Sequence, residues 1–272
     1  MIRVEWTRQV RRIRTWACLA MLAAVPIIIT ISSYVDPPRE RRFDLNLFTI
    51  LTSSGINVGV ISLVVMGQFF LVVVVAAFAG ESVSGEATWG TLRYLLVRPV
   101  TRVRLVMAKL TVAYVLTLIA ILVIVGAGLI AGTIAFGWHD ATAIQQTRFF
   151  PLPVQVPPGE ALGRLALASA YVALTMLVVV AIGIFLSTLT DSTAAAVVGT
   201  VVIIVASQVL TAVPSLSSFK PFLPTRYWDE WRNLFTGDTA QDMWKGVASA
   251  LAFAVIFTVV ALWRFRRKDI LS

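Results

Sequence analysis

The sequence is poor in the residues that disulfide frameworks, metal sites and soluble surfaces require. It has one cysteine and one histidine in 272 residues, and only 14% of its residues are charged. A single cysteine excludes an internal disulfide, and His139 has no second histidine or cysteine near enough to share a metal ion. No pair of nucleophile and base stands out either. We therefore expect no catalytic residue and no metal site.

The sequence is instead rich in long hydrophobic runs. Hydrophobic residues make up 58% of the chain and the mean hydropathy is +0.85, which leaves too little polar surface to cover a soluble globule. Six runs are long enough to cross a bilayer as helices, which takes about 20 residues each. They are residues 15–34, 58–79, 105–131, 165–186, 193–213 and 244–263. The sequence therefore predicts an all-α polytopic membrane protein with six transmembrane helices, in a single domain covering residues 1–272.

Two local patterns support this assignment of spans. The polar residues 187–193 divide the fourth run from the fifth, which predicts a turn between two antiparallel spans. The first run follows basic residues, as the apolar part of a secretory signal peptide does. It is as long as a full span, however, and no small-residue cleavage site precedes Asp36, so we expect a retained helix.

Positive charge is distributed unevenly between the two sides of the predicted bundle. The side of the termini carries 14 cations and five acids, whereas the other side carries nine of each, so the whole net charge of +9 lies on one face. By the positive-inside rule that face is cytoplasmic, which predicts a multi-pass protein of the plasma membrane with both termini in the cytoplasm. Contact with anionic headgroups accounts for most of the basic clusters by itself.

The N-terminal residues 1–14 have the pattern of an amphipathic helix. Ile2, Trp6, Val10 and Ile13 recur at helical spacing, and the arginines lie mostly elsewhere around the helix. Such a helix is expected to lie in the cytoplasmic interface, with its tryptophan inward and its arginines toward lipid phosphates. Its role is either membrane anchoring or a mechanical part in function.

Two segments are expected on the outer side. The four prolines within residues 137–163 favour extended structure there. The segment 214–243 places aromatic residues at helical spacing among charges, which predicts a short helix at the outer interface. Its aromatic residues Tyr227, Trp228 and Trp231 form either an aromatic belt or an outer gate.

Few polar groups are expected at depth. The centres of the six predicted spans contain no ionisable residue, which disfavours an ion-coupled carrier. Gln68 and Gln208 are either interhelical hydrogen-bonding groups or part of a pathway, and Gly128 and Gly132 give a small-x-x-x-small packing face. An uncharged pathway fits lipids, hydrophobic drugs or amphipathic peptides better than free ions.

The polar segment 80–104, between the second and third predicted spans, is unlike its surroundings. Residues 88–97 predict a helix of roughly three turns that Arg98 and Pro99 end. The acids Glu81 and Glu86 favour its N-terminal end, and Gly85 and Gly90 allow a tight turn and close approach. Its apolar face carries Leu92, Leu95 and Leu96. A helix this short is marginal alone, so it must pack on its own spans or on a soluble partner.

This segment resembles the coupling segment of the permeases of ABC-2 type ABC transporters. The positions that carry the resemblance are Glu86, Gly90, Thr91, Leu92, Leu95, Leu96, Arg98, Pro99, Val100 and Arg102, followed by Ala108, Lys109 and Leu110. The resemblance extends over the whole chain, through the N-terminal helix, the spans, an outer Leu-Pro-Thr-x-Tyr segment and the basic C-terminal tail. Within the family the chain is most similar to the permeases that include the one involved in copper processing for nitrous oxide reductase.

The resemblance implies a division of labour between subunits. Two permease copies form the pathway, and two cytosolic ATPases bind ATP and Mg. In agreement, the sequence has no G-x-x-x-x-G-K-[ST] phosphate loop, so we expect this chain to bind no cofactor and to hydrolyse no ATP. The residues expected to couple to the ATPase are Glu81, Glu86, Gly90, Thr91, Leu92, Arg93, Leu95, Leu96, Arg98, Pro99 and Arg102.

The expected function is therefore that of an exporter permease, working with a second permease copy and surrounded by membrane lipid. A homodimer is the default, because closed symmetry favours identical chains, and a heterodimer remains open. No nucleic acid partner is expected. Two alternatives also remain open: a membrane assembly or maturation protein that transports nothing, and an ion-coupled secondary carrier.

Overall fold

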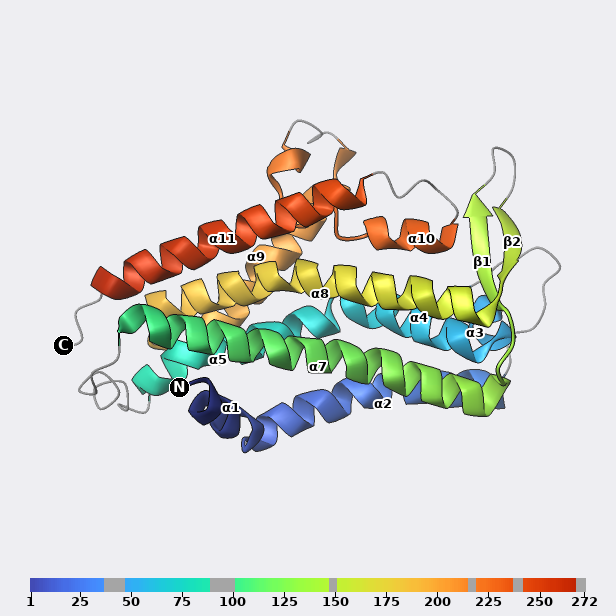
Figure 1. The fold of residues 1–272 in the computed structure, drawn as a ribbon, viewed down its shortest axis with the longest axis horizontal. Coiled ribbons are helices and arrows are strands. Elements are labelled where there is room, and N and C mark those ends of the chain that lie inside the picture. The colour runs from blue at the N-terminus through green and yellow to red at the C-terminus, as the bar shows by residue number, and fades with distance from the viewer. Residues whose placement is uncertain (37–46, 89–100, 147–150, 215–218, 237–241, 268–272) are drawn as a thin grey trace.

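The computed structural model describes residues 1–36, 47–88, 101–146, 151–214, 219–236 and 242–267 of the chain. These residues form a bundle of long helices that run along one axis, with a small hairpin at one end (Figure 1). The long helices are α2 (Ile13–Val35), α4 (Gly55–Gly67), α5 (Phe70–Thr88), α7 (Arg102–Phe136), α8 (Pro158–Leu189), α9 (Thr193–Ala212) and α11 (Met243–Arg267). The short elements are α1 (Ile2–Val10), α3 (Leu47–Ser53), β1 (Ala141–Gln146), β2 (Pro151–Val156), η2 (Lys220–Phe222), η3 (Glu230–Arg232) and α10 (Asn233–Thr236).

The helices expected from apolar length are present. Among the described residues, five helices are long and apolar enough to cross a membrane, namely α2, α7, α8, α9 and α11. The pair α4 and α5 makes a sixth span if the two are counted together. The turn predicted within residues 187–193 lies between the end of α8 and the start of α9. These findings confirm a mostly helical chain with the dimensions of a multi-pass membrane protein.

The second span is not the single straight helix that its sequence predicts. α4 and α5 are bent by 58° relative to each other at a break after Gly67. The carbonyl oxygen of Gln68 at this break accepts a hydrogen bond of 3.1 Å from Gln208 Nε2 on α9. A backbone carbonyl that leaves the helical ladder needs a partner of this kind wherever water does not reach it. The bond from α9 thus helps to stabilise the bend.

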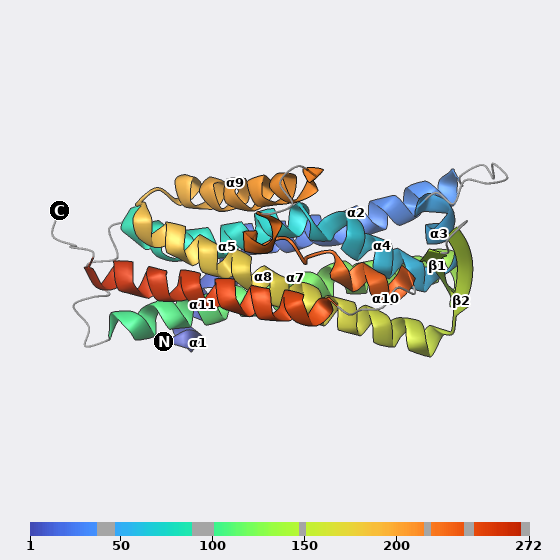
Figure 2. The same ribbon diagram turned by 90° about the horizontal axis from the view of Figure 1, so that it is seen from above.

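Helix α8 occupies the centre of the bundle. In its most apolar 18-residue stretch 72% of the residues are buried, against 22% in each of α2, α9 and α11. It packs against α5, α7, α9 and α11, and Figure 2 shows α9 along one side of this core. A helix that is apolar all round is expected at such a central place. The outer helices carry apolar faces that suit contact with lipid.

The two ends of the bundle differ. At the basic end lie α1, the last turns of α5 and α11 and the first turn of α7; at the hairpin end lie β1 and β2 (Figures 1 and 2). The strands pair antiparallel, with Ala141 opposite Val156. The prolines predicted extended structure here, and this is confirmed. Ala141 and Val156 are buried against Ile56 of α4.

Close backbone contacts join α4 to α7 near the hairpin end. A Cβ atom added to Gly132 would lie 2.5 Å from the carbonyl oxygen of Gly55, and one added to Gly128 would lie 2.6 Å from Ser62 Oγ. Only glycine permits such an approach. The packing expected from Gly128 and Gly132 is therefore present.

Three expectations for the polar segments need correction. The predicted N-terminal helix 1–14 ends at Val10, and α2 begins at Ile13. Residues 80–88 are not a separate segment but the end of α5, and Ser82, Val83, Ser84 and Glu86 are buried against the bundle. The aromatic outer segment forms the 3-10 turns η2 and η3 and the four-residue helix α10 rather than one helix.

Candidate functional site

A buried network of ion pairs joins three helices at the basic end. Lys109 Nζ on α7 lies 2.7 Å from Glu86 Oε1 on α5 and 3.2 Å from Glu5 Oε1 on α1. The same Glu86 oxygen accepts a hydrogen bond from Arg8 Nη1 on α1. The side chain of Lys109 is 0% exposed and that of Glu86 is 1% exposed. The four groups, two cations and two acids, balance their charges within the protein.

A second acid on α5 holds the corner between α1 and α2. Glu81 Oε2 accepts a hydrogen bond of 3.0 Å from Arg12, and Glu81 Oε1 accepts one of 2.8 Å from Arg14. The carboxylate is only 17% exposed. We call the seven residues of both clusters the basic-end network: Glu5, Arg8, Arg12, Arg14, Glu81, Glu86 and Lys109.

The corner itself is fixed by side chains that satisfy the end of α1. The carbonyl oxygen of Gln9 accepts a hydrogen bond of 2.8 Å from Thr15 Oγ1, and that of Val10 accepts one of 2.8 Å from Trp16 Nε1. The last carbonyl groups of a helix have no partner within it, so both bonds replace missing ones. The short α1 is therefore held against the bundle, and Trp6 packs against the protein core.

The network lies at the junction of α5 and α7. α5 ends at Thr88 and α7 begins at Arg102, so the ion pair of Glu86 with Lys109 clamps the two helices that flank residues 89–100. Arg102 Nη1 in turn donates to the carbonyl oxygens of Phe265 and Arg266 at 3.1 and 3.0 Å. These are last-turn carbonyls of α11, where a cation is favourable.

α5 is also fixed to the central helix. Ser187 Oγ on α8 accepts hydrogen bonds from the backbone N–H groups of Val83 and Ser84 at 2.9 and 2.8 Å. A Cβ atom added to Gly183 of α8 would lie 2.7 Å from the Cβ of Ala79 on α5. The end of α5 is thus anchored to α1, α7 and α8 at once.

The coupling residues expected from the sequence are described only at the two flanks of the segment. Glu81, Glu86 and Arg102 are placed as above, and Gly85 lies within α5 rather than in a turn. The other expected coupling residues lie outside the described part of the chain: Gly90, Thr91, Leu92, Arg93, Leu95, Leu96, Arg98 and Pro99. Glu81 and Glu86 lie within α5 and pair with α1, the α1–α2 corner, α2 and α7, and residues 89–97 of the predicted coupling helix lie outside the described part of the chain.

Sequence reasoning missed Glu5, Arg8 and Lys109 as partners. From the sequence, Lys109 belongs only to a family motif, and the arginines of residues 1–14 fit lipid phosphates. A signal was present, since Lys109 lies within the otherwise apolar run 105–131 and two glutamates lie in the polar segment just before that run. A charge in such a run requires a partner at depth, and Glu86 and Lys109 supply each other.

The two glutamines expected at depth form hydrogen bonds between elements. Gln68 Nε2 donates to the carboxylate of Asp229 at 2.9 Å, and Gln208 Nε2 donates to the Gln68 carbonyl. Asp229 also pairs with Arg232 at 3.2 Å. These bonds tie the bend between α4 and α5 to α9 and to the outer segment.

The outer aromatic residues are integrated into the bundle. Trp228 and Trp231 are only 7% and 4% exposed. The rings of Trp231 and Phe235 pack edge to face, with 6.4 Å between their centroids. The carbonyl oxygen of Tyr227 accepts a hydrogen bond of 2.6 Å from the hydroxyl of Tyr171 on α8. Buried tryptophans differ from a lipid-facing aromatic belt, so their main contribution is to fasten the outer segment to α8.

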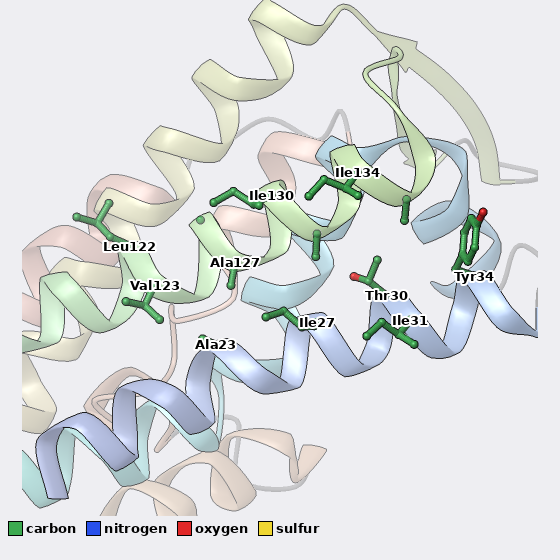
Figure 3. A pocket seen from close by; sticks show the side chains of 13 residues that line it. Ala23, Ile27, Thr30, Ile31, Tyr34, Leu122, Val123, Ala127, Ile130 and Ile134 are labelled. Carbon is green, nitrogen blue, oxygen red and sulfur yellow. The ribbon is translucent and has the colours of Figure 1, made fainter. Parts of the chain in front are cut away.

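An apolar groove of about 870 Å³ runs between α2 and α7 (Figure 3). Its walls carry Ile27, Ile31 and Tyr34 from α2 and Leu122, Ile130 and Ile134 from α7. Gly126 and Ala127 leave the space between these larger side chains. The groove offers apolar contact and almost no hydrogen-bonding groups, which suits a hydrocarbon chain. Within the described ranges no cluster of residues could hold a metal ion.

Several helices of the described chain have the length and apolar character of a multi-pass membrane protein, and the buried ion pairs join them at one end. The chain belongs to the family described as proteins of unknown function, DUF2705, whose model matches residues 19–271. A comparison with curated proteins gives no match.

Proposed function

We propose that the chain is the permease subunit of an ATP-driven exporter of ABC-2 type, working as a dimer with two cytosolic ATPases. The observation that supports this most is the basic-end network. It clamps α5 to α7 on either side of residues 89–100, where the sequence resembles a coupling segment. A motor that moves this segment would therefore move two spans together.

A motor can transmit force through residues 89–100 only if α5 and α7, which flank them, stay packed together. The ion pair between Glu86 and Lys109 is stronger in a dry interior than at a surface, because the local dielectric constant is low. Ser187 links α5 to α8, and Arg102 links α7 to α11. A displacement at residues 89–100 would thus spread through the bundle as a hinge or shear motion.

The division of roles follows the resemblance. Leu92, Leu95 and Leu96 would contact a groove of the ATPase, with Arg93 and Arg98 near its carboxylates. ATP and Mg would bind the partner alone. The basic end, with 14 cations in the sequence, would face the cytoplasm by the positive-inside rule. A hydrophobic or amphipathic substrate fits the apolar groove between α2 and α7.

The test is copurification followed by reconstitution. The tagged full-length chain is extracted from its native membrane in mild detergent, and a bound ATPase is sought and placed with it in liposomes. We expect Arg98→Glu to abolish the stimulation of ATP hydrolysis by the permease without lowering its melting temperature. Arg264→Glu, the same charge reversal on α11 of the basic end, is the matched control and should behave as the wild type. Absence of any ATPase, or normal stimulation in the Arg98 variant, would reject the proposal.

One observation favours a second candidate, an ion-coupled carrier. Glu86 and Lys109 are ionisable and fully buried, and ionisable pairs of this kind mark proton pathways in membrane proteins. Uptake by liposomes that contain the chain alone, driven by a pH gradient without ATP and lost in Glu86→Gln, would support the carrier over the exporter.

A further inference from the structure

A second cavity, separate from the apolar groove, lies at the corner between α1 and α2. It measures about 580 Å³, and its lining includes Arg8, Arg11, Arg12 and Arg14 together with Glu81 and Gly85 of α5. The arginines come from the end of α1, the corner and the first turn of α2. Residues 8–14 thus place four guanidinium groups around one cavity.

The charges around this cavity do not balance. Four arginines line it with a single carboxylate, and Arg12 and Arg14 share that carboxylate. Arg8 pairs with Glu86, which Lys109 also uses. Arg11 makes no ion pair with any residue that the structure describes. The guanidinium groups around the cavity outnumber the carboxylates, and a guanidinium group can donate two parallel hydrogen bonds to an oxyanion such as phosphate.

The N-terminus of α9 adds positive electrostatic potential at the same cavity. Thr193, the first residue of α9, lies on the cavity wall, and α9 is 20 residues long. The first turn of a helix carries partial positive charge and N–H groups that favour anions. Asp191, two residues earlier, is not part of the described lining.

The position of the cavity indicates which kind of phosphate would reach it. Ile13 also lines it and is 86% exposed, and Trp16 one turn further along α2 is 60% exposed. Exposed apolar and tryptophan side chains of this kind mark the level at which a helix enters the membrane. The cavity therefore lies where headgroups meet hydrocarbon. We propose that it binds the phosphate of an anionic phospholipid headgroup, with the acyl chains lying along the start of α2.

The chain offers a way to fill this cavity without altering a charge. No described atom lies within 4 Å of a Cβ built on Gly85, and this residue faces the cavity from within α5. Gly85→Leu would place a side chain in the space for the headgroup. Helix α5 should tolerate it, because leucine is a better helix former than glycine.

The experiment compares spin-labelled phosphatidylglycerol with spin-labelled phosphatidylcholine on the purified full-length chain in phosphatidylcholine membranes. The fraction of motionally restricted label gives their relative association constant. We expect the wild type to prefer phosphatidylglycerol, and Arg11→Gln with Arg14→Gln to reduce the preference roughly tenfold or more, since each cation near the surface contributes to anionic lipid binding. Gly85→Leu should reduce it as well.

Two controls decide the interpretation. Arg264→Gln with Arg266→Gln removes the same charge from α11 at the basic end and should leave most of the preference in place. Equal losses in both double variants would show a diffuse surface effect and overturn the proposal, as would a full preference in Gly85→Leu. If millimolar inorganic phosphate displaces the labelled lipid, the site takes a soluble phosphate and the lipid assignment is wrong. No displacement supports the lipid. The proposal does not depend on the exporter function, because the measurement involves neither ATP nor transport.

Discussion

The two ends of the bundle hold their helices together by different forces. At the basic end, Glu81 and Glu86 each bind two cations from other helices. At the hairpin end, glycines bring the backbones of α4 and α7 together, and the hairpin packs on α4. An acid with two partners can lose one and keep the other, whereas a close backbone contact has no alternative arrangement. The comparison shows that paired charges stabilise the packing at the basic end, whereas close backbone contacts stabilise it at the hairpin end.

The largest effect is expected from Lys109→Met. The change removes the cation that pairs with both Glu5 and Glu86, and loss of one partner from a buried ion pair costs about 3 kcal/mol or more. The free energy of unfolding, measured in mixed micelles, should fall by that amount.

The double variant Lys109→Met with Glu86→Gln serves as the control. It restores the charge balance, because Glu5 and Arg8 remain, so it should unfold less easily than Lys109→Met alone. If the two losses simply add, the network is not the balanced unit described above.

A smaller loss is expected at the hairpin end from Gly132→Ala. The new methyl group would lie 2.5 Å from the Gly55 carbonyl oxygen and 2.7 Å from the side chain of Val58. Overpacking of this kind costs about 1–3 kcal/mol. Unfolding in mixed micelles again gives the measurement.

Gly126→Ala, six residues earlier on the same helix, is the matched control for this contact. No described atom lies within 4 Å of a Cβ at Gly126, so the substitution should be close to neutral. Equal stability of the two variants would mean that α4 and α7 separate freely, and the contrast between the two ends would fail.

The sequence predicts most of the fold because span length and polar breaks are local properties. The run that became α8 and the turn before α9 are examples, since each depends only on neighbouring residues. The prolines that excluded a long helix before α8 act in the same local way. The bend after Gly67 could not be predicted, because it is stabilised in part by Gln208, 140 residues away.

The candidate site could be predicted only in part. The sequence indicates Glu81 and Glu86 as acids near the start of a predicted helix, and Glu86 and Arg102 through the family resemblance. Their partners could not be inferred from spacing, since Arg12 lies 69 residues from Glu81 and only the packing of α1 and α2 on the bundle unites them. The arginines of residues 1–14 fit a lipid surface equally well, and burial of the acids on α5 decides which arginines turn inward.

The smallest of these effects is expected from Arg102→Gln, which tests whether the start of α7 is tied to α11. The guanidinium group donates to two last-turn carbonyls, and a hydrogen bond from a charged group contributes about 1.5–3 kcal/mol when dry and less at a partly exposed position such as this. We expect a global loss near 1 kcal/mol at most, but a clear local effect, because the carbonyl oxygens of Phe265 and Arg266 would lose these two hydrogen bonds. Hydrogen exchange of the amides around Phe265 should accelerate, while exchange in the middle of α11 should not change.

Arg104→Gln, two residues further along α7, removes the same charge from an exposed side chain and is the matched control. Unchanged exchange at Phe265 in the Arg102 variant would mean that α7 and α11 move independently at the basic end, which would leave the ion pair of Glu86 with Lys109 as the clamp there.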